Sequence, residues 1–231
     1  MYLSKLTLNP RSRFARVDLA SPHQMHKTIM RAFPDADDGG PGRVLFRVDR
    51  TKDEYDQPIP IVLVQSDKEP DWSRLTRVPE YGGYAHVEKP KEFDAVFPVG
   101  RRFVFRLRAN PTVKRIISTD DGEPVLNRKG KPKSARHGLF TEEQQEQWIQ
   151  RKADAGGFHV LTCRTIPEPT VQDTIKKNAH LRRRATFHAV RFEGVLEVTD
   201  PETFRNTVQA GIGSAKGMGF GLLSITPVRT E

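Results

Sequence analysis

Two histidines stand three residues apart in the stretch SPHQMHKTIMRAF, which runs from Ser21 to Phe33. Histidine titrates near neutral pH, so the imidazoles of His23 and His26 could donate protons to a substrate or accept protons from it. Lys27 follows directly and adds a positive charge that could stabilise a negatively charged transition state. From residue types alone, the two histidines could be packed core residues, metal ligands or catalytic groups.

A metal site here is short of ligands. A structural zinc ion takes four protein ligands, and a catalytic zinc ion usually takes three. The chain has seven histidines but one cysteine, Cys163, and no Cys-x-x-Cys or His-Glu-x-x-His pattern accompanies His23 and His26. His159 and His188 fall in apolar strand segments and are interpreted as core residues. We therefore predict that the protein binds no metal and needs no cofactor.

Cleavage of RNA without a metal is chemistry that these residue types can support. It needs a base for the 2′-OH, an acid for the leaving 5′-oxygen and positive charge near the phosphorane. Histidine suits either proton-transfer role, and such a group typically contributes about 10²–10⁴-fold in rate. His26 is the better placed of the pair because it falls at the margin of an apolar helix face, where a shifted pKa and access to substrate are compatible.

A glycine-rich stretch, GIGSAKGMGFG, lies near the other end of the chain. Glycine allows positive φ angles and close backbone approach, and successive free N–H groups can hold phosphate oxygens. Two common phosphate motifs do not fit, since Lys216 precedes a glycine where a Walker A loop has Gly-Lys-Ser/Thr, and stands where a Rossmann fingerprint has glycine. A phosphate loop and a simple turn both remain open. The glycines in question are Gly211, Gly213, Gly217, Gly219 and Gly221.

The charge balance indicates a polyanionic partner. Lysine and arginine total 38 against 29 aspartates and glutamates, which gives a formal net charge of +9. Such an excess most often serves nucleic acid, although it does not separate RNA from DNA. Three arginines at alternate positions of one predicted strand, Arg102, Arg106 and Arg108, share a face of that strand. Further basic residues cluster in the loop at 114–136 and in a predicted hairpin at 176–184.

The N-terminal part of the chain predicts a βαββαβ order. A strand at 2–10 precedes an irregular basic connection at 13–20. Ser21 as N-cap, Pro22 at the first helical position and Gln24 three residues after the cap predict the start of a helix. Strands at 43–50 and 59–67, a helical turn near 69–75 and a weaker strand at 81–88 complete the ferredoxin-like order.

The second half repeats this order with insertions. A strand at 101–111 leads through a long polar loop or hairpin to a helix that Thr141 can cap. Strands at 158–166 and 186–200, a helix capped by Asp200 and a final strand at 220–228 follow. We predict an α+β protein with two tandem ferredoxin-like domains, 1–90 and 97–231, joined by a Pro- and Lys-rich linker.

No membrane span is predicted, because no apolar run approaches the roughly 18 residues that a crossing needs. The N-terminal stretch MYLSKLTLNPRSR has neither an apolar core nor a small-residue cleavage site, so no secretory signal is expected. A single cysteine excludes a disulfide within the chain. These features together predict a cytoplasmic protein.

Several segments also carry a family resemblance. They are the opening MYLSKLTLNP, the helix start HQMHKT, the strand FRLRANP and the C-terminal pair FEGVLEVTDP and GIGSAKGMGFGLLSITP. Over almost its full length the chain resembles the CasE (Cse3) family, the endoribonucleases of the RAMP superfamily that process precursor CRISPR RNA in type I-E systems. The resemblance implies two ferredoxin-like domains, binding of the stem-loop of the CRISPR repeat and cutting at the 3′ base of the stem. It also implies attack by the 2′-OH without a metal, and retention of the product as a subunit of Cascade.

The resemblance assigns the family's catalytic histidine to His26. The family carries a tyrosine where this chain has His23, so His23 could replace that tyrosine, share acid and base roles with His26, or have lost the role. Lys27 is predicted to stabilise charge, and the patch around Arg183 to grip RNA. The predicted RNA-binding residues are Arg13, Arg16, Lys27, Arg31, Arg102, Arg106, Arg108, Lys176, Arg182, Arg183, Arg184 and Lys216. The alternative is a non-catalytic module of the same superfamily that holds CRISPR RNA.

Overall fold

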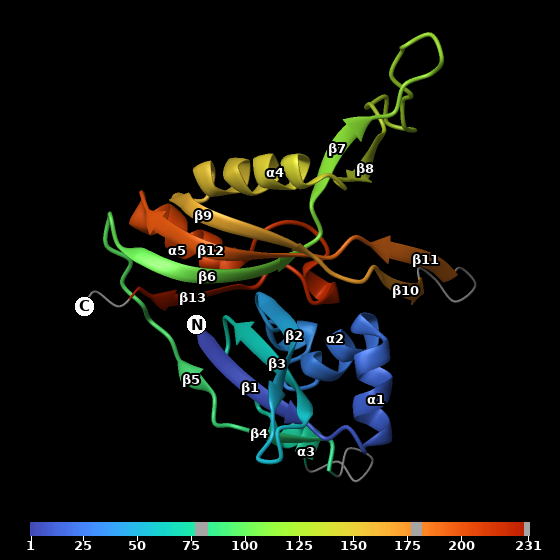
Figure 1. Ribbon diagram of the computed structural model, residues 1–231. Coiled ribbons are helices and arrows are strands. Elements are labelled where there is room, and N and C mark those ends of the chain that lie inside the picture. The colour runs from blue at the N-terminus through green and yellow to red at the C-terminus, as the bar shows by residue number, and fades with distance from the viewer. Residues whose placement is uncertain (77–82, 177–181, 229–231) are drawn as a thin grey trace.

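The computed structural model describes residues 1–76, 83–176 and 182–228, which build two large antiparallel sheets, each with its own helices, and two separate hairpins (Figure 1). In the N-terminal sheet, β1 (Tyr2–Leu8), β2 (Val44–Lys52), β3 (Pro58–Ser66) and β4 (Ala85–Val87) lie in the order β2-β3-β1-β4. In the C-terminal sheet, β6 (Arg102–Ala109), β9 (Phe158–Pro167), β12 (Val190–Val198) and β13 (Leu223–Pro227) lie in the order β13-β6-β12-β9. The same spatial order in both confirms two ferredoxin-like units in tandem.

The helices of each unit cover one face of its sheet. In the C-terminal unit, α4 (Glu142–Asp154) and α5 (Pro201–Ala210) begin at the predicted caps, Thr141 and Asp200. Phe105 of β6, Trp148 of α4 and Phe204 of α5 meet in one core. The N-terminal unit has α1 (Arg13–Ala20), α2 (Pro22–Met30), the 3-10 turn η1 (Ala36–Asp38) and α3 (Ser73–Thr76). None of the helices in the described ranges is long and apolar enough to cross a bilayer.

The segment at 13–20 is a helix, so the prediction of an irregular connection there was wrong. Ser12 caps α1 by accepting a hydrogen bond from the Ala15 N–H. The buried face of α1 consists of Ala15 and Asp18, while Phe14 and Val17 are exposed, which inverts the usual amphipathic pattern. Asp18 accepts a 2.8 Å hydrogen bond from the Tyr84 hydroxyl, and burial raises the pKa of its carboxyl group. Asp18 stands on the buried face where a helix usually has an apolar residue, so the sequence lacks the apolar pattern that predicts a helix.

Two hairpins are inserted into the C-terminal unit. The first, β7 (Thr112–Ile116) with β8 (Ser134–Gly138), projects away from the rest of the molecule and carries the basic residues of the loop at 114–136 (Figure 1). The second, β10 (Val171–Lys176) with β11 (Arg182–Phe187), lies above α1 and α2 in the same view. The strand predicted at 186–200 is therefore divided, because β11 belongs to this hairpin and β12 belongs to the sheet.

Two further details of the prediction needed correction. His159 is exposed on β9 and does not lie in the core, whereas His188 is half-buried with its Nε2 3.3 Å from Gln145 Nε2. The predicted linker is tied to both units, since β5 (Lys91–Glu92) pairs with β1 and Arg205 of α5 pairs with Asp94. The division of the chain at 90 and 97 stays a prediction.

Candidate active site

His26 lies on α2, whose sequence fixes its position. Ser21 caps the helix by accepting the Gln24 N–H, as the capping pattern predicted. Met25 and Ile29 are almost fully buried and hold one face of α2 against the N-terminal sheet. His26 is half-buried at the margin of that face, which is the position predicted for it.

The His26 imidazole lies next to two other parts of the chain. The ring of Phe46, on β2, stacks with it at 6.3 Å between centroids and 18° between planes. Gly217, in the 3-10 turn η3 (Lys216–Met218), is so close that a Cβ added there would lie 3.6 Å from His26 Nε2. The Nδ1 atom is buried with no hydrogen-bond partner among the described residues. Nε2 is therefore the nitrogen that a substrate can engage.

This environment favours neutral imidazole. Burial lowers the pKa of His26 below its ordinary value of 6.5, and the nearby charge of His23 lowers it further. At pH 7 the ring is therefore mostly uncharged and able to accept a proton. The structure thus places the two predicted histidines close enough for one to influence the other, and the role of His23 in catalysis stays a prediction.

The glycine stretch packs against this site and is more than a loose turn. A Cβ added at Gly219, where φ is +80°, would lie 3.1 Å from the Phe46 ring. The N–H of Gly221 donates a 2.8 Å hydrogen bond to the Arg108 carbonyl, which ties the stretch to β6. Gly211 ends α5 with φ at +74°. Close packing over His26 and Phe46 therefore explains Gly217 and Gly219, while a Cβ at Gly211 or Gly213 would meet Leu45 or Trp148 instead.

Lys216 does not point its charge at His26. Its Nζ donates a 2.7 Å hydrogen bond to the Ala210 carbonyl at the end of α5. Burial lowers the pKa of Lys216, and the charges of Arg43 and Lys152 lower it further. This position stabilises the C-terminal end of a helix, where a cation is favourable. A role for Lys216 in RNA binding stays a prediction.

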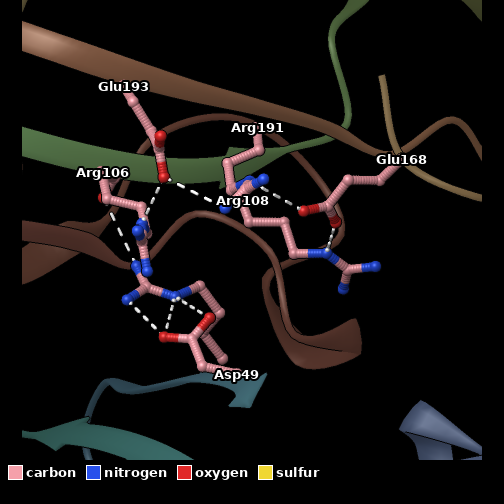
Figure 2. Close-up of polar contacts among 7 residues, drawn as sticks. Asp49, Arg106, Arg108, Glu168, Arg191 and Glu193 are labelled. Atoms are coloured by element: carbon pink, nitrogen blue, oxygen red, sulfur yellow. Dashed lines mark hydrogen bonds and ion pairs between the residues drawn. The ribbon is translucent and has the colours of Figure 1, made fainter. Parts of the chain in front are cut away.

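The strand arginines share one face of β6 as predicted, but each is paired with a glutamate. Glutamate oxygens lie 2.8 Å from Arg102, 2.6 Å from Arg106 and 2.6 Å from Arg108. Figure 2 shows how the last two of these pairs are joined through a further arginine. The partners are Glu197, Glu193 and Glu168, and the joining residue is Arg191. A phosphate would have to displace a carboxylate to bind here.

The other predicted basic residues lie on α1, on α2 and on the β10–β11 hairpin. Arg13, Arg16 and Lys27 are exposed on α1 and α2, and no ion pair of theirs with another described residue is seen. Arg184 is exposed on β11 and donates a long 3.4 Å hydrogen bond to Gln172. Arg31 is exposed at the end of α2. Lys176, Arg182 and Arg183 belong to the β10–β11 strands, with their side chains outside the described part.

Three contributors to this site were not predicted. Phe46 was read only as part of a strand, although it contacts His26. Asp173 of β10 accepts hydrogen bonds from the first turn of α2. Arg47, nearly fully buried on β2, forms an ion pair with Asp49 and donates to the Arg106 carbonyl across the two units. No group of three or more potential metal ligands gathers within the described residues.

Comparison with known proteins identifies the family. The sequence matches the model of the family described as CRISPR associated protein over residues 1–227. It is 39% identical to the CRISPR-associated endoribonuclease Cse3 of Thermus thermophilus, over 98% of this chain and 100% of that protein. The chain belongs to the CasE family. The CRISPR system Cascade subunit CasE of Escherichia coli is 32% identical, over 99% of this chain and 100% of that protein.

Solved structures of the CasE family share the whole fold. A structure of CRISPR endoribonuclease Cse3 bound to a 19 nt RNA superposes with a TM-score of 0.79 at 36% identity, over 98% of this chain and 100% of that one. Thermus thermophilus Cse3 bound to an RNA that represents a pre-cleavage complex gives a TM-score of 0.72 at 36% identity, over 98% of both chains. The match covers both ferredoxin-like units.

Proposed function

We propose that this protein is an endoribonuclease that processes precursor CRISPR RNA by binding the stem-loop of the repeat, and that it serves as a subunit of Cascade. Its relatives in the CasE family include an endoribonuclease, an RNA complex in a pre-cleavage state and a Cascade subunit. The observation that carries the proposal is the position of the His26 imidazole, which is half-buried between the Phe46 ring and Gly217 and follows the first turn of α2, where the β10–β11 hairpin is hydrogen-bonded.

The proposed reaction uses the RNA's own 2′-hydroxyl. Neutral His26 takes the proton of this hydroxyl through Nε2, and the oxygen attacks the adjacent phosphorus. The bond from phosphorus to the 5′-oxygen breaks, which leaves a 2′,3′-cyclic phosphate and a 5′-hydroxyl that needs a proton. His23 is a candidate for that acid, and Lys27 for the charge that stabilises the phosphorane. We place the cut at the 3′ base of the stem and the protein in the cytoplasm, where transcripts are processed.

The proposed function is tested by incubating the wild-type protein with its cognate repeat hairpin in EDTA. A matched RNA carries 2′-deoxyribose at the nucleotide before the cut. We expect cleavage of the normal RNA to a cyclic phosphate and no cleavage of the deoxy RNA at equal affinity. Tight binding of the normal RNA without cleavage would instead support the alternative of a module that only holds CRISPR RNA.

The pH dependence of cleavage follows from the lowered pKa of His26. If His26 is the base, kcat/KM should rise with pH and reach half its plateau below pH 6.5, because protonated imidazole cannot accept a proton. A pH series in the presence of EDTA measures this midpoint. A midpoint above 6.5, or a rate that falls with pH in this range, would contradict the assignment.

The lowered pKa of His26 also has a consequence for folding stability. The stability that neutral His26 contributes to the folded state is lost as pH falls from 6.5 through the folded-state pKa.

A methyl group at Gly217 is expected to obstruct the site without disturbing the fold. The new Cβ would stand 3.6 Å from His26 Nε2 in ordinary contact, over the nitrogen that receives the proton. Gly217→Ala should therefore lower the cleavage rate about tenfold or more, since small displacements of reacting groups are costly, with little change in Tm. The matched variant Gly219→Ala introduces a side chain at φ +80° and should lower stability by about 1–2 kcal/mol. Full activity of Gly217→Ala would contradict this view of the site.

A further inference from the structure

The first turn of α2 is held by a carboxylate from the other ferredoxin-like unit. Asp173, on β10, accepts the His23 N–H through Oδ2 at 2.8 Å. The Ser21 hydroxyl lies 3.2 Å from Asp173 Oδ1 and 3.0 Å from Oδ2, and donates to this carboxylate. The same hydroxyl oxygen accepts the Gln24 N–H. Ser21 caps α2 from within the N-terminal unit, and Asp173, in the C-terminal unit, fixes the orientation of the Ser21 hydroxyl group.

Asp173 completes the hydrogen bonding at this helix end. Pro22 has no N–H, the Gln24 N–H is taken by Ser21 Oγ, and the Met25 N–H donates to the Ser21 carbonyl at 3.0 Å. The remaining donor, the His23 N–H, depends on Asp173. The first turn of α2 contains no acidic residue of its own, so Asp173 supplies the negative charge that a helix N-terminus favours. His26 follows one turn later on the same short helix.

The hairpin that carries Asp173 also touches the other wall of the site. Phe187, on β11, packs against Phe220 with ring centroids 6.0 Å apart. Phe220 stands between Gly219 and Gly221, and the Arg108 guanidinium lies 4.7 Å from its ring centroid. The β10–β11 hairpin thus contacts α2 through one strand and the glycine stretch through the other. The His26 ring lies at the contact between α2 and the glycine stretch, next to Gly217.

We propose that Asp173 is a positioning residue, which sets the place of His26 relative to RNA held by the β10–β11 hairpin. This inference rests on the proposed function. The strand that pairs with β10 carries Arg182, Arg183 and Arg184, so the element expected to grip RNA is hydrogen-bonded to the helix expected to cut it. Without the carboxylate, α2 loses its link to the hairpin and His26 loses its alignment with the bound 2′-hydroxyl. The rate of cleavage by the complex therefore falls, while the affinity for RNA stays.

The test compares Asp173→Ala with wild type in single-turnover cleavage of the cognate repeat hairpin at saturating protein, with Kd measured on the 2′-deoxy RNA. We expect a loss of about 10–100-fold in rate, the range that a misplacement near 1 Å produces, and little change in Kd. Asp173→Asn should lose less, because its amide oxygen can still accept the His23 N–H. In a His26→Ala background, Asp173→Ala should cause no further loss, since it acts through His26.

A matched control separates positioning from stability. Asp200 caps α5 in the C-terminal unit by accepting the N–H groups of Glu202 and Thr203, at 3.1 Å each. Asp200→Ala should lower Tm about as much as Asp173→Ala and leave the cleavage rate unchanged. An unchanged rate in Asp173→Ala, a loss confined to Kd, or an equal rate loss in Asp200→Ala would each overturn the inference. Failure of the proposed function is distinct, because the wild type itself would then not cleave.

Discussion

Replacing His26 with alanine is expected to lower the rate of RNA cleavage by about 10²–10⁴-fold, the usual contribution of a general base or acid, and to leave the affinity for the repeat hairpin nearly unchanged. The imidazole is the titratable group enclosed by Phe46 and Gly217, and burial keeps it neutral. The exposed basic residues that would bind phosphates lie outside this enclosure, on α1, on the surface of α2 and on β11. This variant should therefore lose RNA cleavage and keep RNA binding.

The measurement is single-turnover cleavage beside a binding titration on 2′-deoxy RNA. His159→Ala is the matched control, because it removes an exposed imidazole from β9 on the C-terminal sheet. We expect the control to cut at the wild-type rate. If His26→Ala cut at a rate within a fewfold of wild type, His26 would not be the base, and His23 would become the first candidate. If it lost binding as well, the ring would be part of the RNA surface.

The order of elements could be predicted from the sequence because local signals agreed with the final fold. Ser21, Thr141 and Asp200 cap helices in the structure as their sequence contexts indicated. Arg102 and Arg106 alternate with buried phenylalanines on β6, as a half-exposed strand requires. The prediction failed at α1, where Asp18 takes the buried position and finds its partner in Tyr84, far along the chain. A local pattern cannot show a partner at that separation.

The candidate site was predicted only in part for the same reason. His26 could be located because the capping pattern fixes the helix on which it lies. Phe46 and Gly217 reach it from different segments, so their contact depends on tertiary packing. The ion pair of Arg106 with Glu193 could not be predicted in the same way. Both residues lie on predicted strands, but only the register between β6 and β12 shows that they stand opposite each other. Charge counted along a sequence therefore overstates the surface open to RNA.

Arg47→Met is expected to lower the free energy of unfolding more than the loss of any other ion-paired residue in the described part of the chain. The Arg47 side chain is 3% exposed and the Asp49 side chain 17%. The Arg47 guanidinium donates through Nε and Nη2 to Asp49, and through Nη1 to the Arg106 carbonyl. Figure 2 shows Asp49 and Arg106 on either side of this contact. Methionine would fill much of the space but leave the Asp49 carboxylate without its partner, which typically costs about 3–5 kcal/mol.

Urea unfolding at pH 7 measures this loss, with Arg102→Met as the control. Arg102 forms a pair of similar length with Glu197 but is 60% exposed, so its removal should cost at most about 1 kcal/mol. The double variant Arg47→Met with Asp49→Leu should recover much of the loss, because no buried charge is then left unpaired. An Arg47→Met cost no larger than that of Arg102→Met would show that water reaches Asp49 freely. Since Arg47 joins β2 to β6 directly beside Phe46, that result would also remove one reason for expecting the two units to hold the His26 site rigidly.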